Sequence, residues 1–79
     1  MDSEYYSKLR FRIEDLRVYI SYMQHFTPDQ CDELNSLHTD MMLVCSGFAS
    51  FDGFLFERFD LLTAELNPVV LSVFYQQAS

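Results

Sequence analysis

The sequence predicts an all-α fold, a small bundle of three to four helices, and three observations support this prediction. Only two glycines and two prolines interrupt the 79 residues, which favours a few long helices over many short strands. Apolar residues near the N-terminus recur at alternating steps of three and four, the spacing of a helix face packed in a bundle. Thr27-Pro28-Asp29-Gln30 has the composition of a helix start. A chain this short has room for one core, so we expect residues 1–79 to form a single helical domain.

The first predicted helix covers residues 3–25. Ser3 is a suitable N-cap, and Glu4 carries the negative charge that the N-terminal end of a helix favours. The core-facing seam of this helix consists of Leu9, Ile13, Leu16, Ile20 and Met23.

The second predicted helix covers residues 28–46. Thr27 is a good N-cap, Pro28 falls at the first helical position, and Gln30 stands where it can complete a capping box. Gly47 is a suitable C-terminal stop. The apolar face of this helix consists of Leu34, Leu37, His38, Met41, Val44, Cys45 and Phe48.

A third helix is predicted over residues 51–66, and a short fourth helix over residues 68–76. The third carries a seam of Phe51, Leu55, Phe59, Leu62 and Leu66. We expect it to end at Asn67, because proline disfavours the α conformation in the residue before it. Valine-rich residues 68–76 favour a strand on propensity. A helix is predicted there all the same, because the sequence offers no partner strand and a lone strand would leave its backbone unpaired.

The charge distribution narrows the possible partners. The net charge is −7; residues 1–26 hold four acidic and four basic side chains, whereas residues 27–79 hold eight acidic side chains and one arginine. An acidic surface repels phosphate groups and anionic lipids, so we expect no direct contact with nucleic acid or membrane. The chain begins without the pattern of a signal peptide, and no 18 consecutive residues are apolar. Both observations predict a cytoplasmic protein with reduced cysteines.

No motif for catalysis or for a cofactor is found, so we expect neither an enzyme nor a cofactor protein. Cys31, His38 and Cys45 lie seven residues apart on one predicted helix face. Two ligands on one helix need a spacing of about four residues to hold one ion, so we expect no metal site. His38 is predicted to be a hydrogen-bonded core residue instead, beside inert thiols.

A second apolar stripe on the first helix is the best indication of function. Phe11, Val18 and Tyr22 lie opposite the core seam, with Tyr19 beside them. A surface helix in a monomer carries one apolar stripe, so two opposed stripes imply that both sides are covered. The cover is the fourth segment, a second copy or a different protein. We therefore hypothesise a protein-protein interaction module: a homodimer, or a small subunit that docks on and modulates a larger protein. Its charged rim would be Lys8, Arg10, Arg12 and Arg17.

An acidic face supports a second hypothesis. Four carboxylates lie opposite the apolar face of the second helix and two more lie on the third: Asp29, Asp32, Glu33, Asp40, Glu57 and Asp60. Such a face keeps an aromatic-rich domain soluble. It also suits an acidic inhibitor, of the type carried by phages or mobile elements, that occupies a nucleic-acid-binding site of a host protein.

Overall fold

The computed structural model describes residues 3–78, which form three α-helices and one short 3-10 helix. Helix α1 spans Ser3–Ile20, the 3-10 helix η1 spans Met23–His25, α2 spans Pro28–Cys45 and α3 spans Phe54–Ala78. No strand occurs among these described residues. The prediction of an all-α protein is confirmed, and the three helices are consistent with a small bundle.

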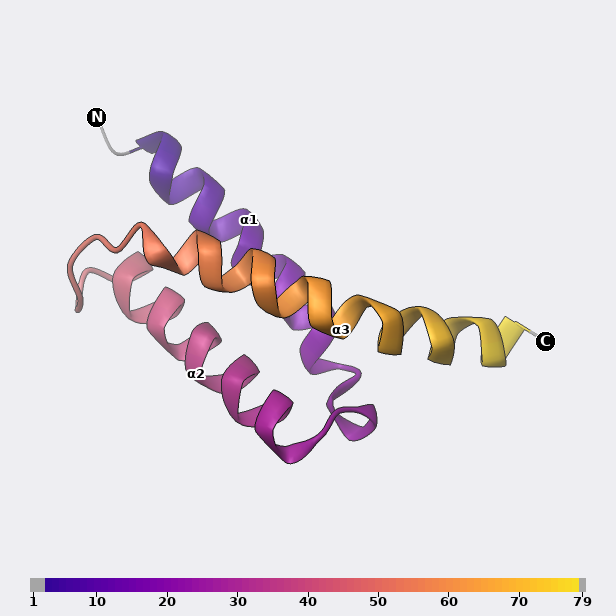
Figure 1. The fold of residues 1–79 in the computed structure, drawn as a ribbon. Coiled ribbons are helices and arrows are strands. Elements are labelled where there is room, and N and C mark those ends of the chain that lie inside the picture. The colour runs from indigo at the N-terminus through magenta and orange to yellow at the C-terminus, as the bar shows by residue number, and fades with distance from the viewer. Residues whose placement is uncertain (1–2, 79) are drawn as a thin grey trace.

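The helices run up, down and up (Figure 1). Helices α1 and α3 point in the same general direction, because Tyr5 contacts the beginning of α3 and Tyr19 contacts its middle. Helix α2 returns in the opposite direction and packs on both. The last part of α3 extends beyond the other two helices, so the molecule measures 47 × 23 × 17 Å along its principal axes.

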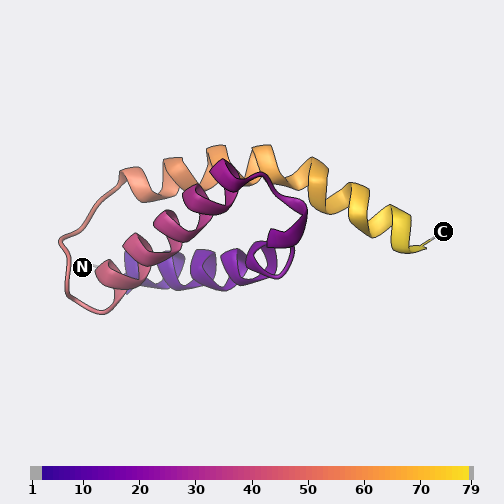
Figure 2. The same cartoon turned by 90° about the horizontal axis from the view of Figure 1, so that it is seen from below.

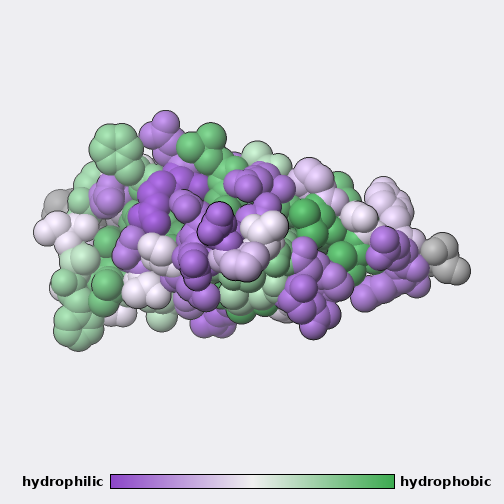
Figure 3. Space-filling model, turned by 60° about the horizontal axis from the view of Figure 1, so that its bottom comes forward, coloured by the Kyte–Doolittle hydropathy of each residue, from purple (hydrophilic) through white to green (hydrophobic). Residues whose placement is uncertain are grey.

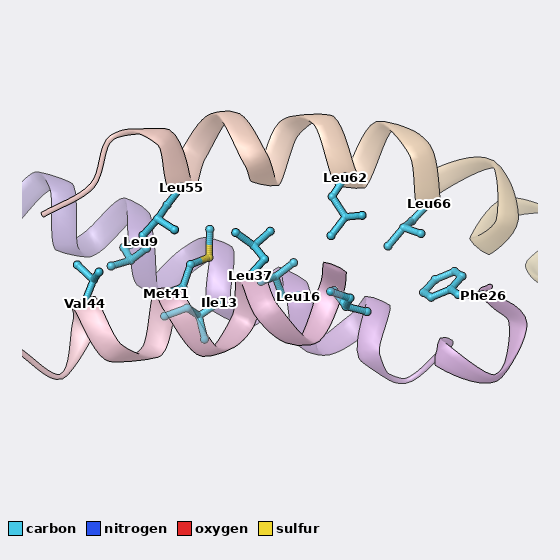
Figure 4. Packing of buried hydrophobic residues seen from close by; sticks show 11 residues of the cluster. Leu9, Ile13, Leu16, Phe26, Leu37, Met41, Val44, Leu55, Leu62 and Leu66 are labelled. Atoms are coloured by element: carbon cyan, nitrogen blue, oxygen red, sulfur yellow. The ribbon is translucent and has the colours of Figure 1, made fainter. Parts of the chain in front are cut away.

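The core lies between the three helices (Figure 4). Helix α1 contributes three buried residues, α2 four and α3 three, and Phe26 closes one end from the turn before α2. They are Leu9, Ile13, Leu16, Phe26, Leu34, Leu37, Met41, Val44, Leu55, Leu62 and Leu66. Each fully buried aliphatic side chain stabilises the fold by about 1.5–3 kcal/mol relative to an exposed one. The predicted seams of the first two helices therefore supply most of this core.

The predicted start of α2 is confirmed, and the helix ends at Cys45, one residue before the predicted end. The Thr27 side chain accepts a hydrogen bond from the Gln30 N–H at 3.2 Å, and Gln30 Oε1 accepts one from the Thr27 N–H at 3.0 Å. These reciprocal bonds form the capping box, with Pro28 in the first turn. At the other end Gly47 has φ +82°, a left-handed conformation that favours glycine, and its N–H donates to the Val44 carbonyl.

The first helix is shorter than predicted. The α-helix ends at Ile20, and residues 21–25 form tighter turns in which Tyr22 N–H donates to the Tyr19 carbonyl and His25 N–H to the Tyr22 carbonyl. Phe26 then adopts an extended backbone and is buried. A continued α-helix would carry this ring away from the core, so its burial accounts for the early end.

The third helix begins later than predicted, at Phe54 rather than at residue 51. The Asp52 side chain accepts a hydrogen bond from the Phe54 N–H at 2.9 Å, which satisfies a backbone donor in the first turn of the helix. The Tyr5 hydroxyl donates to the Asp52 carbonyl at 3.1 Å and holds this residue outside the helix. Phe51 is exposed and does not belong to the core seam.

The predicted break at Asn67-Pro68 is wrong, because α3 continues through Pro68 to Ala78. Residues 68–76 are helical as expected, but they extend α3 rather than form a fourth helix. The Asn67 side chain accepts a hydrogen bond from the Tyr19 hydroxyl and so is held against α1 instead of capping a new helix. Continuation also buries Val73 and half-buries Val69 and Val70. Figure 2 shows α3 changing direction at this level, the usual response of a helix to an internal proline.

Candidate protein-binding surfaces

The residues of the apolar stripe predicted on α1 differ in their exposure to solvent. Phe11 and Val18 are 69% and 54% exposed, whereas Tyr19 and Tyr22 are half-buried against the core. Because the C-terminal residues extend α3, they do not fold back over Phe11 and Val18.

Burial raises the pKa of Tyr19 above its ordinary value of 10.0, and the Asp15 charge raises it further, while the hydrogen bond with Asn67 opposes the shift.

Three of the four basic residues around this stripe have partners within the chain. Lys8 pairs with Glu4 at 3.1 Å and Arg17 with Glu14 at 3.2 Å, both along α1. The Arg12 guanidinium lies over the Phe56 ring at 4.3 Å from its centre, so this residue joins α1 to α3. Arg12 therefore belongs to the helix packing and not to a charged rim.

A second apolar surface runs along α3 on the side turned away from the core, and we call it the outer seam. Its residues follow one another at alternating steps of three and four and are all exposed: Phe54, Glu57, Leu61, Ala64, Pro68, Leu71 and Tyr75. The four large side chains among them are 52–70% exposed. The core-facing residues Leu55, Leu62 and Leu66 point the other way (Figure 4). Sequence reasoning missed the outer seam because Asn67-Pro68 divided it into two helices too short to show the pattern.

The end of α3 is also free of charge. Glu65 is the last charged residue of the chain, and Phe74 lies exposed beside the outer seam. At the opposite end of the molecule, Phe48, Phe51 and Phe54 are exposed around the loop between α2 and α3. Figure 3 shows green at one end of the molecule, a mainly hydrophilic middle, and green mixed with purple toward the other end.

Most of the predicted acidic residues of α2 are exposed on the surface, and one is paired. Asp29, Asp32 and Glu33 are exposed. Asp40 differs, because its carboxylate forms an ion pair with Arg58 at 2.8 Å that joins α2 to α3. On α3, Glu57 and Asp60 are exposed, and Glu57 belongs to the outer seam.

A hollow of about 300 Å³ lies where the start of α2 meets α3. It is lined by Thr27, Asp29, Gln30, Glu33, Leu62 and Glu65. Gln30 Nε2 donates to Glu65 Oε1 at 3.1 Å across it. Thr27 and Gln30 form the helix cap, and the bond from Gln30 to Glu65 joins α2 to α3.

The prediction that His38 is a hydrogen-bonded core residue is only partly correct. The residue is half-buried on the apolar side of α2, but its Nε2 atom has no hydrogen-bond partner among the described residues. Cys31 and Cys45 are free and half-buried. The part of the chain that the structure describes holds no group of three or more histidine, cysteine or carboxylate side chains placed to bind a metal ion.

Comparisons with known proteins do not assign the chain to a family. No family model matches the chain, and neither the curated proteins nor the solved structures include one that is similar to it. Within residues 3–78, no helix has both the length and the apolar character needed to cross a bilayer.

Proposed function

We propose that the protein is a protein-protein interaction module that works by binding and not by catalysis. The observation that supports this most strongly is the outer seam of α3, on which four large apolar side chains lie exposed along one line. Exposed large apolar side chains that gather along one face of a helix mark an interaction site. Phe11 and Val18 add a second exposed apolar area on α1.

The amino-acid types of this surface fit the role. Phenylalanine, tyrosine and methionine are enriched in the centres of protein interfaces, where they supply large contact areas. The outer seam ends in Tyr75 and begins in Phe54, and the neighbouring Phe74 is exposed as well. We place the protein in the cytoplasm, because its two cysteines are free thiols.

Sedimentation equilibrium over a wide concentration range, at low and at high salt, tests this proposal when it is combined with a hydrophobic dye. An apolar interface predicts either self-association that depends weakly on salt, or a monomer whose free surface binds the dye. A monomer at every concentration that binds no dye would exclude the proposal, because its apolar side chains would then offer no usable surface.

An acidic inhibitor of a nucleic-acid-binding protein is the second candidate. It is supported by the exposure of Asp29, Asp32 and Glu33, none of which forms an ion pair within the described residues. This candidate predicts a basic partner, binding that weakens steeply as salt rises, and loss of binding in the triple variant Asp29→Asn, Asp32→Asn, Glu33→Gln. Binding that is insensitive to salt would exclude it.

A further inference from the structure

We infer that the outer seam of α3 binds the same seam of a second copy, with the two helices antiparallel. This inference rests on the proposed function and identifies the partner of that surface. Helix α3 therefore has two packing faces: one that faces α1 and α2, and one reserved for the partner.

The spacing of the outer seam is that of a coiled-coil contact. Alternating steps of three and four place side chains on one narrow line of a helix, where they interlock with an equivalent line on another helix. In α3 this line is distinct from the buried line of Leu55, Leu62 and Leu66. A helix that carried only the core face would show polar residues at the outer positions.

The second half of α3 gives an independent reason to expect that another helix packs on it. Eleven residues from Pro68 to Ala78 continue past the end of α1. One side of this segment packs on the bundle, because Val69 and Val70 contact the core cluster and Val73 is buried. The other side carries Leu71 and Tyr75, which are exposed. Packing of Leu71 and Tyr75 against another helix would bury this second side and stabilise a segment rich in weak helix formers.

The antiparallel direction follows from the single charged residue in the seam. We align the two antiparallel seams at their middles. In this register Leu61 of one copy faces Leu71 of the second copy, and Ala64 faces Pro68. Glu57 then faces the partner's Tyr75, whose hydroxyl is a hydrogen-bond donor for the carboxylate. A parallel pair would instead place the two Glu57 carboxylates side by side, where like charges repel.

The shape of the helix agrees with this pairing. The bend at Pro68 lies near the middle of the seam, and the second half of α3 slopes toward the rest of the bundle (Figure 2). Two such faces approach most closely at the middle and separate toward their ends. The seam has its smallest side chain, Ala64, next to the middle and its aromatic side chains, Phe54 and Tyr75, near the ends, where there is more space to fill.

The seam supplies part of the area that a dimer needs. Aromatic side chains bury about 150–250 Å² each, so Phe54 and Tyr75, at 70% and 66% exposure, offer roughly 200–340 Å² per copy. Two copies would bury roughly 400–700 Å² with these two aromatic side chains alone, and Leu61, Leu71 and the flanking positions add to it. Specific interfaces bury about 1,200–2,000 Å² in total. The absence of charged residues after Glu65 also limits the repulsion between two acidic chains.

A charge-pair experiment on the full chain tests both the surface and the direction. Leu61→Lys and Leu71→Glu are exposed substitutions, so each variant should fold, as circular dichroism would verify. Each should weaken self-association at least about 30-fold, the loss typical of an interface hot spot. Mixing the two variants should restore a dimer, because the introduced lysine of one chain then faces the introduced glutamate of the other while the second Leu61–Leu71 contact is kept. Leu43→Lys, at an exposed apolar position on α2, is the matched control and should leave the dimer intact.

Three outcomes would overturn the inference. A wild-type monomer at all concentrations would exclude the second copy, yet the proposed function would survive if that monomer bound the hydrophobic dye. Dimers that persist in both seam variants would move the interface elsewhere, again without contradicting the proposed function. Failure of the mixture to form a heterodimer would exclude the antiparallel pairing. All measurements use sedimentation velocity at matched concentration.

Discussion

Replacing Pro68 by alanine should stabilise the protein, although the residue lies in the middle of its longest helix. Proline in a helix interior lacks the N–H that would donate to the carbonyl four residues earlier, here that of Ala64, and its ring presses on that carbonyl. The cost relative to alanine is about 3 kcal/mol in a regular helix. The substitution also loses about 0.4–1 kcal/mol of stability, because proline restricts the conformations of the unfolded chain and alanine does not.

We expect a net gain of about 1–2 kcal/mol, since the bend already relieves part of the clash. For a domain of this size, this gain raises Tm by about 5–15 °C. Thermal and urea unfolding, followed by circular dichroism at one fixed low protein concentration, measure the effect without a contribution from self-association.

Pro28→Ala is the matched control, because Pro28 stands at the first helical position where no N–H is required. This variant should be unchanged or destabilised by up to about 1 kcal/mol. A Pro68→Ala variant no more stable than the wild type would refute the reasoning. It would mean that the bend at Pro68 makes contacts worth as much as the lost hydrogen bond.

Three further predictions concern the core, the N-cap of α2 and the ionisation of Tyr19. Leu37→Ala removes a fully buried side chain and should lower the free energy of unfolding by about 2–5 kcal/mol in urea denaturation. Thr27→Ala removes the capping box and should cost about 1 kcal/mol, measured in the same way, whereas Thr27→Ser should retain most of the stability. Tyr19 has a raised pKa, so the folded state binds its proton more tightly than the unfolded state, and stability should fall as pH rises above 10.0. Alkaline unfolding of Tyr19→Phe should show a smaller fall than that of the wild type, and equal curves would contradict the assignment.

Local signals in the sequence were sufficient for much of the fold. The capping box at Thr27 and the glycine at position 47 act through bonds between neighbouring residues, so they define α2 without any knowledge of the tertiary structure. The seams of α1 and α2 follow from the helical period alone. These features were predicted correctly because local and tertiary preferences agree, except for Phe48, which lies beyond the end of α2 and is 82% exposed.

The errors occurred where tertiary contacts outweigh local preference. Asn67-Pro68 disfavours a continuous helix, but the hydrogen bond from Tyr19 and the burial of Val73 favour it, and neither contact is visible in the order of residues. The early end of the first helix reflects the burial of Phe26. The outer seam was missed for the same reason, because its pattern emerges only when residues 54–75 belong to one helix.

Amide hydrogen exchange along the second half of α3 tests the central claim most directly, because that claim requires a second copy of the chain to cover this helix. The amides of residues 71–77 should exchange slowly in concentrated solution and much faster after dilution, as the second copy dissociates and the extension frays. Exchange of the core amides near Leu37 provides the internal reference. Equal rates for residues 71–77 at both concentrations, with the core unchanged, would contradict the account, because the extension would then behave identically with and without a partner.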